Sequence, residues 1–96
     1  MTNIYVVPQP RFPFGELYVT YPAEQTISTE DIEFALKCHA NGDWGDVCDE
    51  DREENERALI EGRRLFSAYT DRNSVKFWII TESDRSATTV LLPDDY

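Results

Sequence analysis

"RLFSAYTDRNSVKFWIITESDRSATTVLLP", residues 64–93, is the stretch that decides the fold. Its three runs, at 64–70, 74–81 and 87–93, are rich in β-branched and aromatic residues, which favour strands. The DRN and ESDRS segments between them are short and polar, as tight turns are. The pattern predicts a C-terminal antiparallel β-meander.

The middle run of the meander is apolar on both of its faces. Two sets of residues alternate along it, with Val75, Phe77 and Ile79 on one face and Trp78 and Ile80 on the other. A sheet with one solvated face would carry polar residues at every second position. The second face is therefore expected to be covered by the N-terminal segment, or to meet another chain in a homodimer.

A helix is predicted over residues 29–40, upstream of the meander. Ser28 is followed three residues later by Asp31, which is the spacing of a capping box. Apolar residues recur at helical spacing along one stripe that ends at His39. Gly42 is expected to end the helix, because glycine tolerates the left-handed conformation of a helix C-terminus.

A second helix is predicted over residues 47–61, with Gly62 as its C-terminal stop. Asp46 or Asp49 is expected to cap its start, where the helix dipole favours acids. Trp44 lies between two glycines in the loop that joins the helices. It is expected to plug the core, with the glycines allowing a tight backbone turn; the alternative is a recognition aromatic.

The N-terminal part of the chain supplies one more strand. Residues 16–21, ELYVTY, alternate between apolar and polar positions, which predicts a strand. Residues 1–14 form a proline-interrupted arm with a possible short edge strand, IYVV, near its start. Phe12 and Phe14 are expected to pin this arm to a single domain formed by residues 15–96.

These elements predict an α+β fold. An N-terminal strand would be followed by two helices, packed on one face of a three- to four-stranded antiparallel sheet. The residues expected to form the core are Leu17, Val19, Ile32, Leu36, Trp44, Leu59, Phe66, Phe77, Ile79 and Leu91.

The charge of the chain limits its partners. Nineteen acidic residues against nine basic ones give a formal net charge of −10. This excess argues against direct binding of nucleic acid or of an anionic membrane, both of which need a basic surface. It suits a protein partner with a basic surface. No apolar run is long enough to span a membrane and no signal peptide is evident, so the cytoplasm is the expected location.

The two cysteines and their neighbours predict neither a metal nor a cofactor. Cys38 and Cys48 are ten residues apart without a CxxC motif, so reduced thiols are expected, with a disulfide as the alternative. His39, Asp43, Asp46 and Cys48 are all metal-ligating residue types, but their spacing matches no standard site. The simpler interpretation is that the histidine closes a helix stripe and the two aspartates cap loop and helix.

The acidic run predicts a partner-binding face. Nine of the residues 43–61 are acidic. Carboxylates four residues apart on a helix lie about 6 Å from each other, close to the spacing of phosphates along a nucleic-acid strand. The alternative is an ordinary solvated helix face. The residues expected to form the face are Asp46, Asp49, Glu50, Glu53 and Glu54.

A polar site is the second candidate. Asp51 and Asn55 lie on the inward stripe of the second helix, where unpaired polar groups cost free energy. Asp84 and Arg85 lie in a hydroxyl-rich turn that could hold a phosphate. All four could converge in one pocket, or each could simply satisfy backbone groups of loops and turns.

Three motifs make the chain resemble a family of small bacterial, plasmid and phage proteins. They are H-x-x-G-D-W-G-D at residues 39–46, G-R-R-L-F-S-A-Y at 62–69 and W-I-I-T-E-S-D-R-S-A-T-T-V-L-L-P-D-D-Y at 78–96, with Asp51 and Asn55 between the first two. Members of this family are commonly labelled plasmid-related or hypothetical, and some carry a restriction-modification label.

The resemblance covers residues 28–96 and is not shared by the arm, since family members usually begin near the ELYVTY strand. It implies a mobile-element setting and offers no catalytic residue. Together with the charge, it leads to the main hypothesis: a non-enzymatic protein that inhibits a host nucleic-acid-binding defence complex, of restriction or CRISPR type, by imitating phosphates. The alternatives are a small enzyme or ligand-binding protein using the polar site, and a homodimeric structural module.

Overall fold

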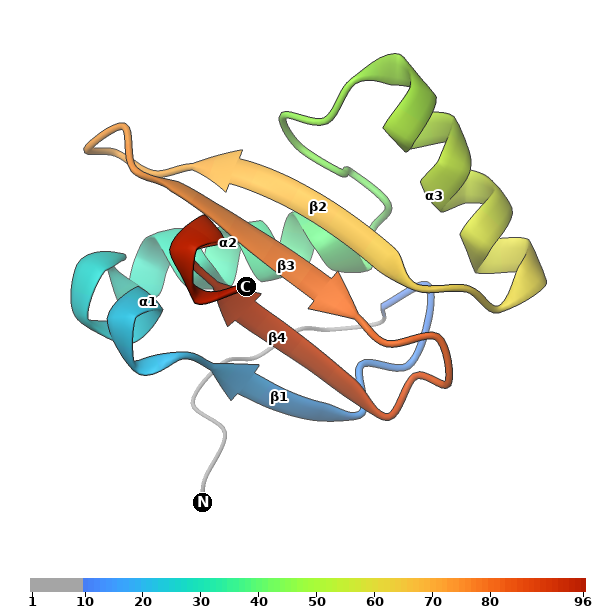
Figure 1. Ribbon diagram of the computed structural model, residues 1–96, viewed down its shortest axis with the longest axis horizontal. Helices are drawn as coiled ribbons and strands as arrows, with labels where there is room; N and C mark the ends of the chain where they lie inside the picture. Colours follow the sequence, from blue (N-terminus) through green and yellow to red (C-terminus); the bar gives the residue numbers. More distant parts are fainter. Residues whose placement is uncertain (1–9) are drawn as a thin grey trace.

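A computed structural model describes residues 10–96 and contains a four-stranded sheet with three helices (Figure 1). The chain is α+β, as the sequence predicts. In chain order its elements are β1 (Glu16–Val19), α1 (Tyr21–Thr26), α2 (Thr29–Ala40), α3 (Asp49–Glu61), β2 (Leu65–Thr70), β3 (Lys76–Thr81), β4 (Ala87–Leu91) and the 3₁₀ turn η1 (Pro93–Asp95).

The sheet is mixed, which corrects the prediction of an antiparallel one. Strands β2, β3 and β4 form the expected antiparallel meander, but β1 adds to the far edge of β4 in parallel, in the order β1-β4-β3-β2. Glu16 lies opposite Ala87 and Val19 opposite Val90. All the helices and two strands intervene between β1 and β4, and such a long connection permits parallel pairing.

Helix α1 was not expected from the sequence. The strand predicted to reach Tyr21 ends at Val19, and Tyr21 already begins α1. Pro22 lies in the first turn, where its missing N–H is not needed. The Thr20 hydroxyl caps the helix by accepting from the Ala23 N–H at 3.3 Å. The proline thus starts a helix immediately after the strand.

Helix α2 covers one face of the sheet (Figure 1) and has the predicted bounds. Ser28 caps it by accepting from the Asp31 N–H at 3.2 Å, and Asn41 and Gly42 end it, Gly42 with a positive φ of 78°. The buried side chains of this layer come from α1, the residue that follows it, α2, β3 and β4, and they are Ala23, Ile27, Ile32, Ala35, Leu36, Phe77, Ile79 and Val90.

Helix α3 lies along the free edge of β2, beside the sheet (Figure 1). It begins at Asp49, and its N-cap is Cys48, whose side chain makes no capping bond. The prediction that Asp46 or Asp49 caps this helix is therefore wrong. Gly62 ends the helix in the left-handed conformation, as expected. Ala58 is the buried apolar residue that α3 contributes to a second core cluster, around Trp44 and Leu65.

The second sheet face is partly covered from the C-terminal end of the chain, over Trp78 and Ile80. Figure 1 shows η1 and the C-terminus in front of the sheet, on the side opposite α2. The rings of Trp78 and Tyr96 meet edge to face, with centroids 5.9 Å apart, and Arg64 donates to the Tyr96 hydroxyl at 2.7 Å. Ile80 is buried. Within residues 10–96 the cover of this face comes from the C-terminal end, while most of the arm expected to cover it lies outside the described residues. The homodimer stays a prediction.

Six of the ten predicted core residues are buried. One of them is Trp44, which has no exposed surface and fills the core as the sequence predicts. The other four are only half-buried. Two lie on the edge strand β1, and two lie where β2 and α3 meet the solvent-facing side of the sheet. The core prediction is therefore wrong for Leu17, Val19, Leu59 and Phe66.

The last part of the predicted arm packs into the body. Phe12 is buried, Phe14 is half-buried, and the Arg11 N–H donates to the Ala40 carbonyl at 2.8 Å. The Phe14 carbonyl also accepts from the Thr88 hydroxyl at 2.8 Å. The two phenylalanines therefore pin the chain as predicted. The IYVV edge strand lies outside the described residues.

Candidate functional site

The acidic face predicted on the second helix is present on α3, which exposes nearly its whole length. Only Asn55 and Ala58 of its thirteen residues are buried. Glu50 and Glu53 are exposed, and no ion pair engages either carboxylate within residues 10–96. Asp49 is fully exposed, with its carboxylate 3.9 Å from the Arg52 guanidinium. These three carboxylates, at the outer N-terminal half of α3, are available to a partner.

Glu54 differs from its neighbours because two arginines neutralise it. Its carboxylate pairs with Arg57 at 2.7 Å and with Arg63 at 3.1 Å. Both arginines lower the pKa of Glu54 by hydrogen bonding and by their charge. Glu54 was predicted to belong to the partner-binding face, and it is exposed, but its ion pairs with Arg57 and Arg63 also link it to the C-terminal end of α3.

Asp46 lies in the loop before α3 and extends the acidic face toward β2. Its carboxylate accepts from the Thr70 hydroxyl at 2.9 Å, which fixes its orientation. The Asp46 N–H donates to the Ala68 carbonyl at 2.7 Å, so the loop itself adds to the edge of β2. Asp46, Asp49, Glu50 and Glu53 together are called the acidic face below.

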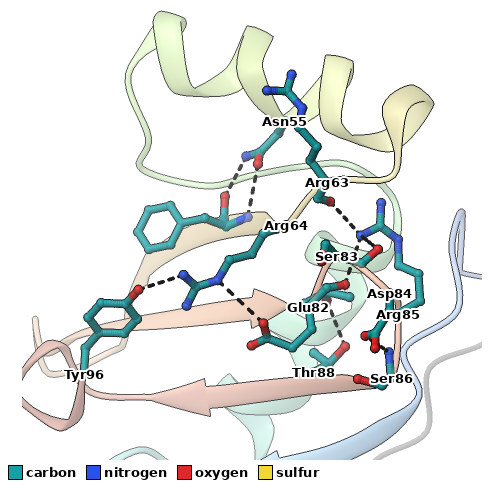
Figure 2. Close-up of polar contacts among 12 residues, drawn as sticks. Asn55, Arg63, Arg64, Glu82, Ser83, Asp84, Arg85, Ser86, Thr88 and Tyr96 are labelled. Atoms are coloured by element: carbon teal, nitrogen blue, oxygen red, sulfur yellow. Dashed lines mark hydrogen bonds and ion pairs between the residues drawn. The ribbon is translucent and has the colours of Figure 1, made fainter.

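Three of the four residues of the predicted polar site, Asn55, Asp84 and Arg85, bind backbone groups at separate places (Figure 2). Asn55 reaches the edge of β2, donating to the Phe66 carbonyl at 2.6 Å and accepting from the Phe66 N–H at 3.1 Å. Asp84 accepts from the Ser86 N–H at 2.9 Å within its own turn. Asp51 was expected on the inward side of its helix, and the structure places it in solvent, which corrects that expectation.

Arg85 holds the β3–β4 turn against the C-terminal end of α3. Its guanidinium donates to the carbonyls of Arg63 at 2.7 Å and Glu82 at 3.1 Å (Figure 2). It also donates to the carbonyl of Ala58 at 3.2 Å. A cation at a helix C-terminus is favoured by the free carbonyls and by the helix dipole. The donors that a phosphate would need are thus engaged by the chain's own backbone.

His39 is at the centre of a buried chain of hydrogen bonds. The Thr88 hydroxyl donates to the Phe14 carbonyl, so it accepts from Thr81, at 2.8 Å. Thr81 therefore accepts from the Nε2–H of His39, at 2.9 Å, and Nδ1 accepts from the Ser67 hydroxyl. Every member of the chain has a partner, and the neutral Nε2–H tautomer is the one that fits.

The surroundings of His39 keep it neutral. Burial, and secondarily the charge of Arg85, lower its pKa to about 3. The rings of Phe12, Phe14 and Trp44 surround the imidazole, with centroids 5.3–5.7 Å away. Since the imidazole is fully buried, it links α2 to the sheet and is not placed to act on a substrate.

The cysteines are separate thiols in the structure. Cys38 is half-buried, and burial raises the pKa of its thiol, while Cys48 is exposed at the start of α3. Within residues 10–96, His, Cys, Asp and Glu nowhere form a group of three or more that could hold a metal ion. The same part of the chain has no helix long and apolar enough to cross a membrane.

A hollow of about 690 Å³ lies between the start of α3 and the solvent-facing side of the sheet. Its apolar lining includes Phe66, Ala68 and Trp78, and the carboxylates of Asp46 and Asp51 lie at its border. Sequence alternation predicts the apolar residues of this sheet face, but not that α3 closes one side of it. The acidic face therefore continues into an apolar depression.

A second cavity, of about 370 Å³, was not anticipated from the sequence. It lies between α2 and the β2–β3 turn, and its lining residues include Asp31, Asp46 and Asp71. In the sequence, Asp71 belongs to a DRN segment whose only evident role is a tight turn. Its distance of forty positions from Asp31 gives no local signal that the two share a cavity.

A scan of protein-family models finds no match to this chain, and searches of curated proteins and of solved structures find none either. The family resemblance drawn from the three sequence motifs therefore stays a prediction.

Proposed function

We propose that this protein is a non-enzymatic inhibitor that binds the basic, nucleic-acid-binding surface of a host defence complex. The observation that carries the proposal is the set of exposed carboxylates on the acidic face: Glu50 and Glu53, without ion pairs in residues 10–96, and Asp46 and Asp49 beside them. The net charge of −10 adds a long-range attraction to any basic partner.

The arrangement of the acidic face supports imitation of phosphates. Asp49 and Glu53 are four residues apart on one helix, which places their Cβ atoms about 5–6 Å from each other on one side of it. Glu50, three residues before Glu53, is its neighbour on the exposed surface of α3. A basic groove made for a phosphate backbone recognises spaced negative charges rather than base edges, so such a row can replace the backbone in it.

The polar groups of the second candidate site and the buried histidine support a role without catalysis. Asn55, Asp84 and Arg85 make hydrogen bonds to backbone groups, and His39 is buried in a complete hydrogen-bond chain. A general acid or base has to reach its substrate, and these groups are held by the fold. The mobile-element setting implied by the sequence resemblance suggests restriction or CRISPR-type complexes as the class of target.

A charge-reversal experiment tests this function. The protein, its Glu50→Lys/Glu53→Lys variant and a Glu24→Lys/Glu30→Lys control are immobilised, and host lysate is passed over each. Glu24 and Glu30 are exposed acids of α1 and α2, so both double variants change the net charge equally. The wild type and the control should retain a nucleic-acid-binding complex that elutes as salt rises, and the α3 variant should not.

The captured complex is then mixed with labelled DNA or RNA to see whether the protein displaces it. Competition by the wild type and the control, but not by the α3 variant, is the expected result. Equal retention on all three columns, elution that ignores salt, or a captured complex that still binds its nucleic acid would each contradict the proposal.

A further inference from the structure

The hollow of about 690 Å³ at the start of α3 has an apolar and aromatic floor. Ala68 lies directly opposite Trp78 in the β2–β3 register, so both side chains are on the solvent-facing side of the sheet. Phe66, two residues before Ala68, is on the same side, and its ring meets that of Trp78 edge to face at 5.1 Å. All three residues are only half-buried, so their apolar surface is accessible to a partner.

Two other segments of the chain form the walls of the hollow. Val47 and Cys48, which lead into α3, line it from one side, and Pro93, the first residue of η1, lines it from another. Figure 1 shows α3 beyond the edge of β2 and η1 in front of the sheet. A recess with a mainly apolar lining and a few polar groups, of about 300–1,000 Å³, is the usual form of a binding site. The hollow therefore has room for a large side chain of a partner.

The border of the hollow toward α3 is acidic. Asp51 is exposed in the first turn of α3, and no ion pair engages its carboxylate within residues 10–96. Asp46 is held at the border by the Thr70 hydroxyl. Lys76, which lies opposite Thr70 in the sheet, is the basic residue of the lining and offsets one of these two charges. Since Asp46 also belongs to the acidic face, the hollow and that face form one continuous surface.

An apolar hollow beside spaced carboxylates complements one kind of nucleic-acid-binding surface. Proteins that hold single strands combine a basic groove, which follows the phosphates, with aromatic side chains on which the bases stack. The bases of an intact duplex are stacked on one another, so a surface made for a duplex contacts phosphates and base edges instead. Carboxylates alone would complement both kinds of surface. A hollow that accepts an aromatic ring complements the single-strand kind.

We infer that the hollow receives an aromatic side chain of the partner, flanked by basic residues that pair with Asp51 and with the acidic face. The partner surface is one made for single-stranded nucleic acid, on which this aromatic side chain stacks with a base when the inhibitor is absent. Phe66 and Trp78 supply the rings against which it packs. The inference rests on the proposed function and deepens it, because it names the class of surface that is blocked.

A peptide titration tests the hollow apart from the rest of the interface. The probe is acetyl-Lys-Phe-Lys-amide, added to the ¹⁵N-labelled protein and followed through the two indole N–H signals. Trp78 lines the hollow, whereas Trp44 is fully buried and donates to Glu56, so its signal is an internal reference. The probe should shift the Trp78 signal at millimolar concentration and leave the Trp44 signal in place. Acetyl-Lys-Ala-Lys-amide, which lacks the ring, and acetyl-Glu-Phe-Glu-amide, which reverses the charge, should shift neither.

Two pairs of variants identify the groups responsible. Ala68→Leu fills the floor of the hollow without changing any charge, and it should weaken binding of the Lys-Phe-Lys peptide at least tenfold. Ala87→Leu is its matched control, because Ala87 is half-buried on the same side of the sheet and lies outside the hollow. Asp51→Asn should weaken binding several-fold, and Glu24→Gln, a change of an exposed acid on α1, should not.

Several results would overturn the inference. They are equal Trp78 shifts with the alanine or the glutamate peptide, normal peptide binding by Ala68→Leu, and a Trp78 signal that moves with protein concentration alone, which would assign the hollow to a second copy. If Ala68→Leu does not fold, Asp51→Asn and the three peptides supply the same test.

The captured complex separates this inference from the proposed function. It should bind single strands, and Ala68→Leu should retain less of it than Ala87→Leu. A complex that binds only duplexes, or that Ala68→Leu retains as well as wild type, refutes the role of the hollow and leaves the proposed function standing. A Lys-Phe-Lys peptide that binds the hollow when no basic partner is captured supports the hollow and contradicts the proposed function.

Discussion

The side-chain amide of Asn55 pairs with both backbone polar groups of Phe66, donating to the carbonyl at 2.6 Å and accepting from the N–H at 3.1 Å. A residue of α3 thus takes the place that a residue of a further strand would occupy at the edge of β2. Two residues along, Ala68 donates to the Trp44 carbonyl at 3.2 Å and accepts from the Asp46 N–H at 2.7 Å. These bonds close an edge that could otherwise pair with another chain.

Removing the Asn55 amide should destabilise the protein by about 2–3 kcal/mol, because both Phe66 backbone groups would lose their partners at a partly buried site. Chemical denaturation of Asn55→Ala measures this loss. Asn73→Ala is the control, since Asn73 is an exposed turn residue, and its effect should stay within about 0.5 kcal/mol. Equal midpoints for the two variants would show that α3 is not anchored through this pair.

Gly45 should tolerate no side chain, whereas Gly62 should tolerate one at moderate cost. Both have positive φ, 75° and 72°, so alanine is strained at either position, by about 1–2 kcal/mol. At Gly45 a Cβ would also collide with the Ala68 carbonyl oxygen and the Tyr69 ring, while at Gly62 it meets nothing. We expect Gly45→Ala to cost at least about 3 kcal/mol in denaturation experiments. Similar costs for the two variants would contradict a close approach of this loop to β2.

The imidazole of His39 should remain neutral in the folded protein from pH 8 to pH 5. It is the one histidine of the chain, so its ring ¹⁵N signals can be assigned without ambiguity. Burial lowers its pKa to about 3, and the hydrogen-bond chain through Thr81 selects the Nε2–H tautomer. Long-range ¹H–¹⁵N spectra should show that tautomer unchanged over this range. An imidazole that titrates near its ordinary pKa of 6.5 would refute the burial of the ring.

The same shift makes folding depend on pH. Below pH 6.5 the unfolded chain takes up a proton at His39, which the folded chain does not take up until about pH 3. Stability therefore falls as the pH drops through this window, by about 2 kcal/mol at pH 5, at 1.36 kcal/mol per pH unit. His39→Gln cannot take up this proton, so its stability should change less between pH 7 and pH 5. Parallel pH profiles for the two proteins would contradict the assignment.

Deleting residues 93–96 should uncover the second sheet face. The deletion removes η1 and the ring of Tyr96, which packs on Trp78. We expect stronger quenching of Trp78 fluorescence by acrylamide and stronger self-association in sedimentation experiments, because the exposed apolar patch grows. Asp94→Ala, a change at an exposed position of the same turn, is the control. A shortened chain with unchanged quenching and mass would show that the C-terminus is not the cover of this face.

The candidate site divides into a part visible in the sequence and a part that is not. The acids of α3 follow one another within a few positions, so the sequence predicts their shared face directly. Pairing with Arg63 adds to the neutralisation of the Glu54 carboxylate, and this pair depends on how the chain turns after Gly62. The cavity around Asp71 joins residues from α2, the interhelical loop and a hairpin turn, and local spacing carries no information about such a meeting.

By itself, the sequence determined the elements whose hydrogen bonds and apolar periodicity are local: α2 with its Ser28 cap, the body of α3, and the antiparallel meander with its short turns. Only the tertiary structure decided the contacts between segments that are far apart in the sequence. The parallel pairing of β1 with β4, the docking of α3 on the β2 edge and the cover by η1 are of this kind. Such contacts satisfy backbone groups and bury apolar surface contributed by distant segments, and their free energies exist only once those segments are brought together.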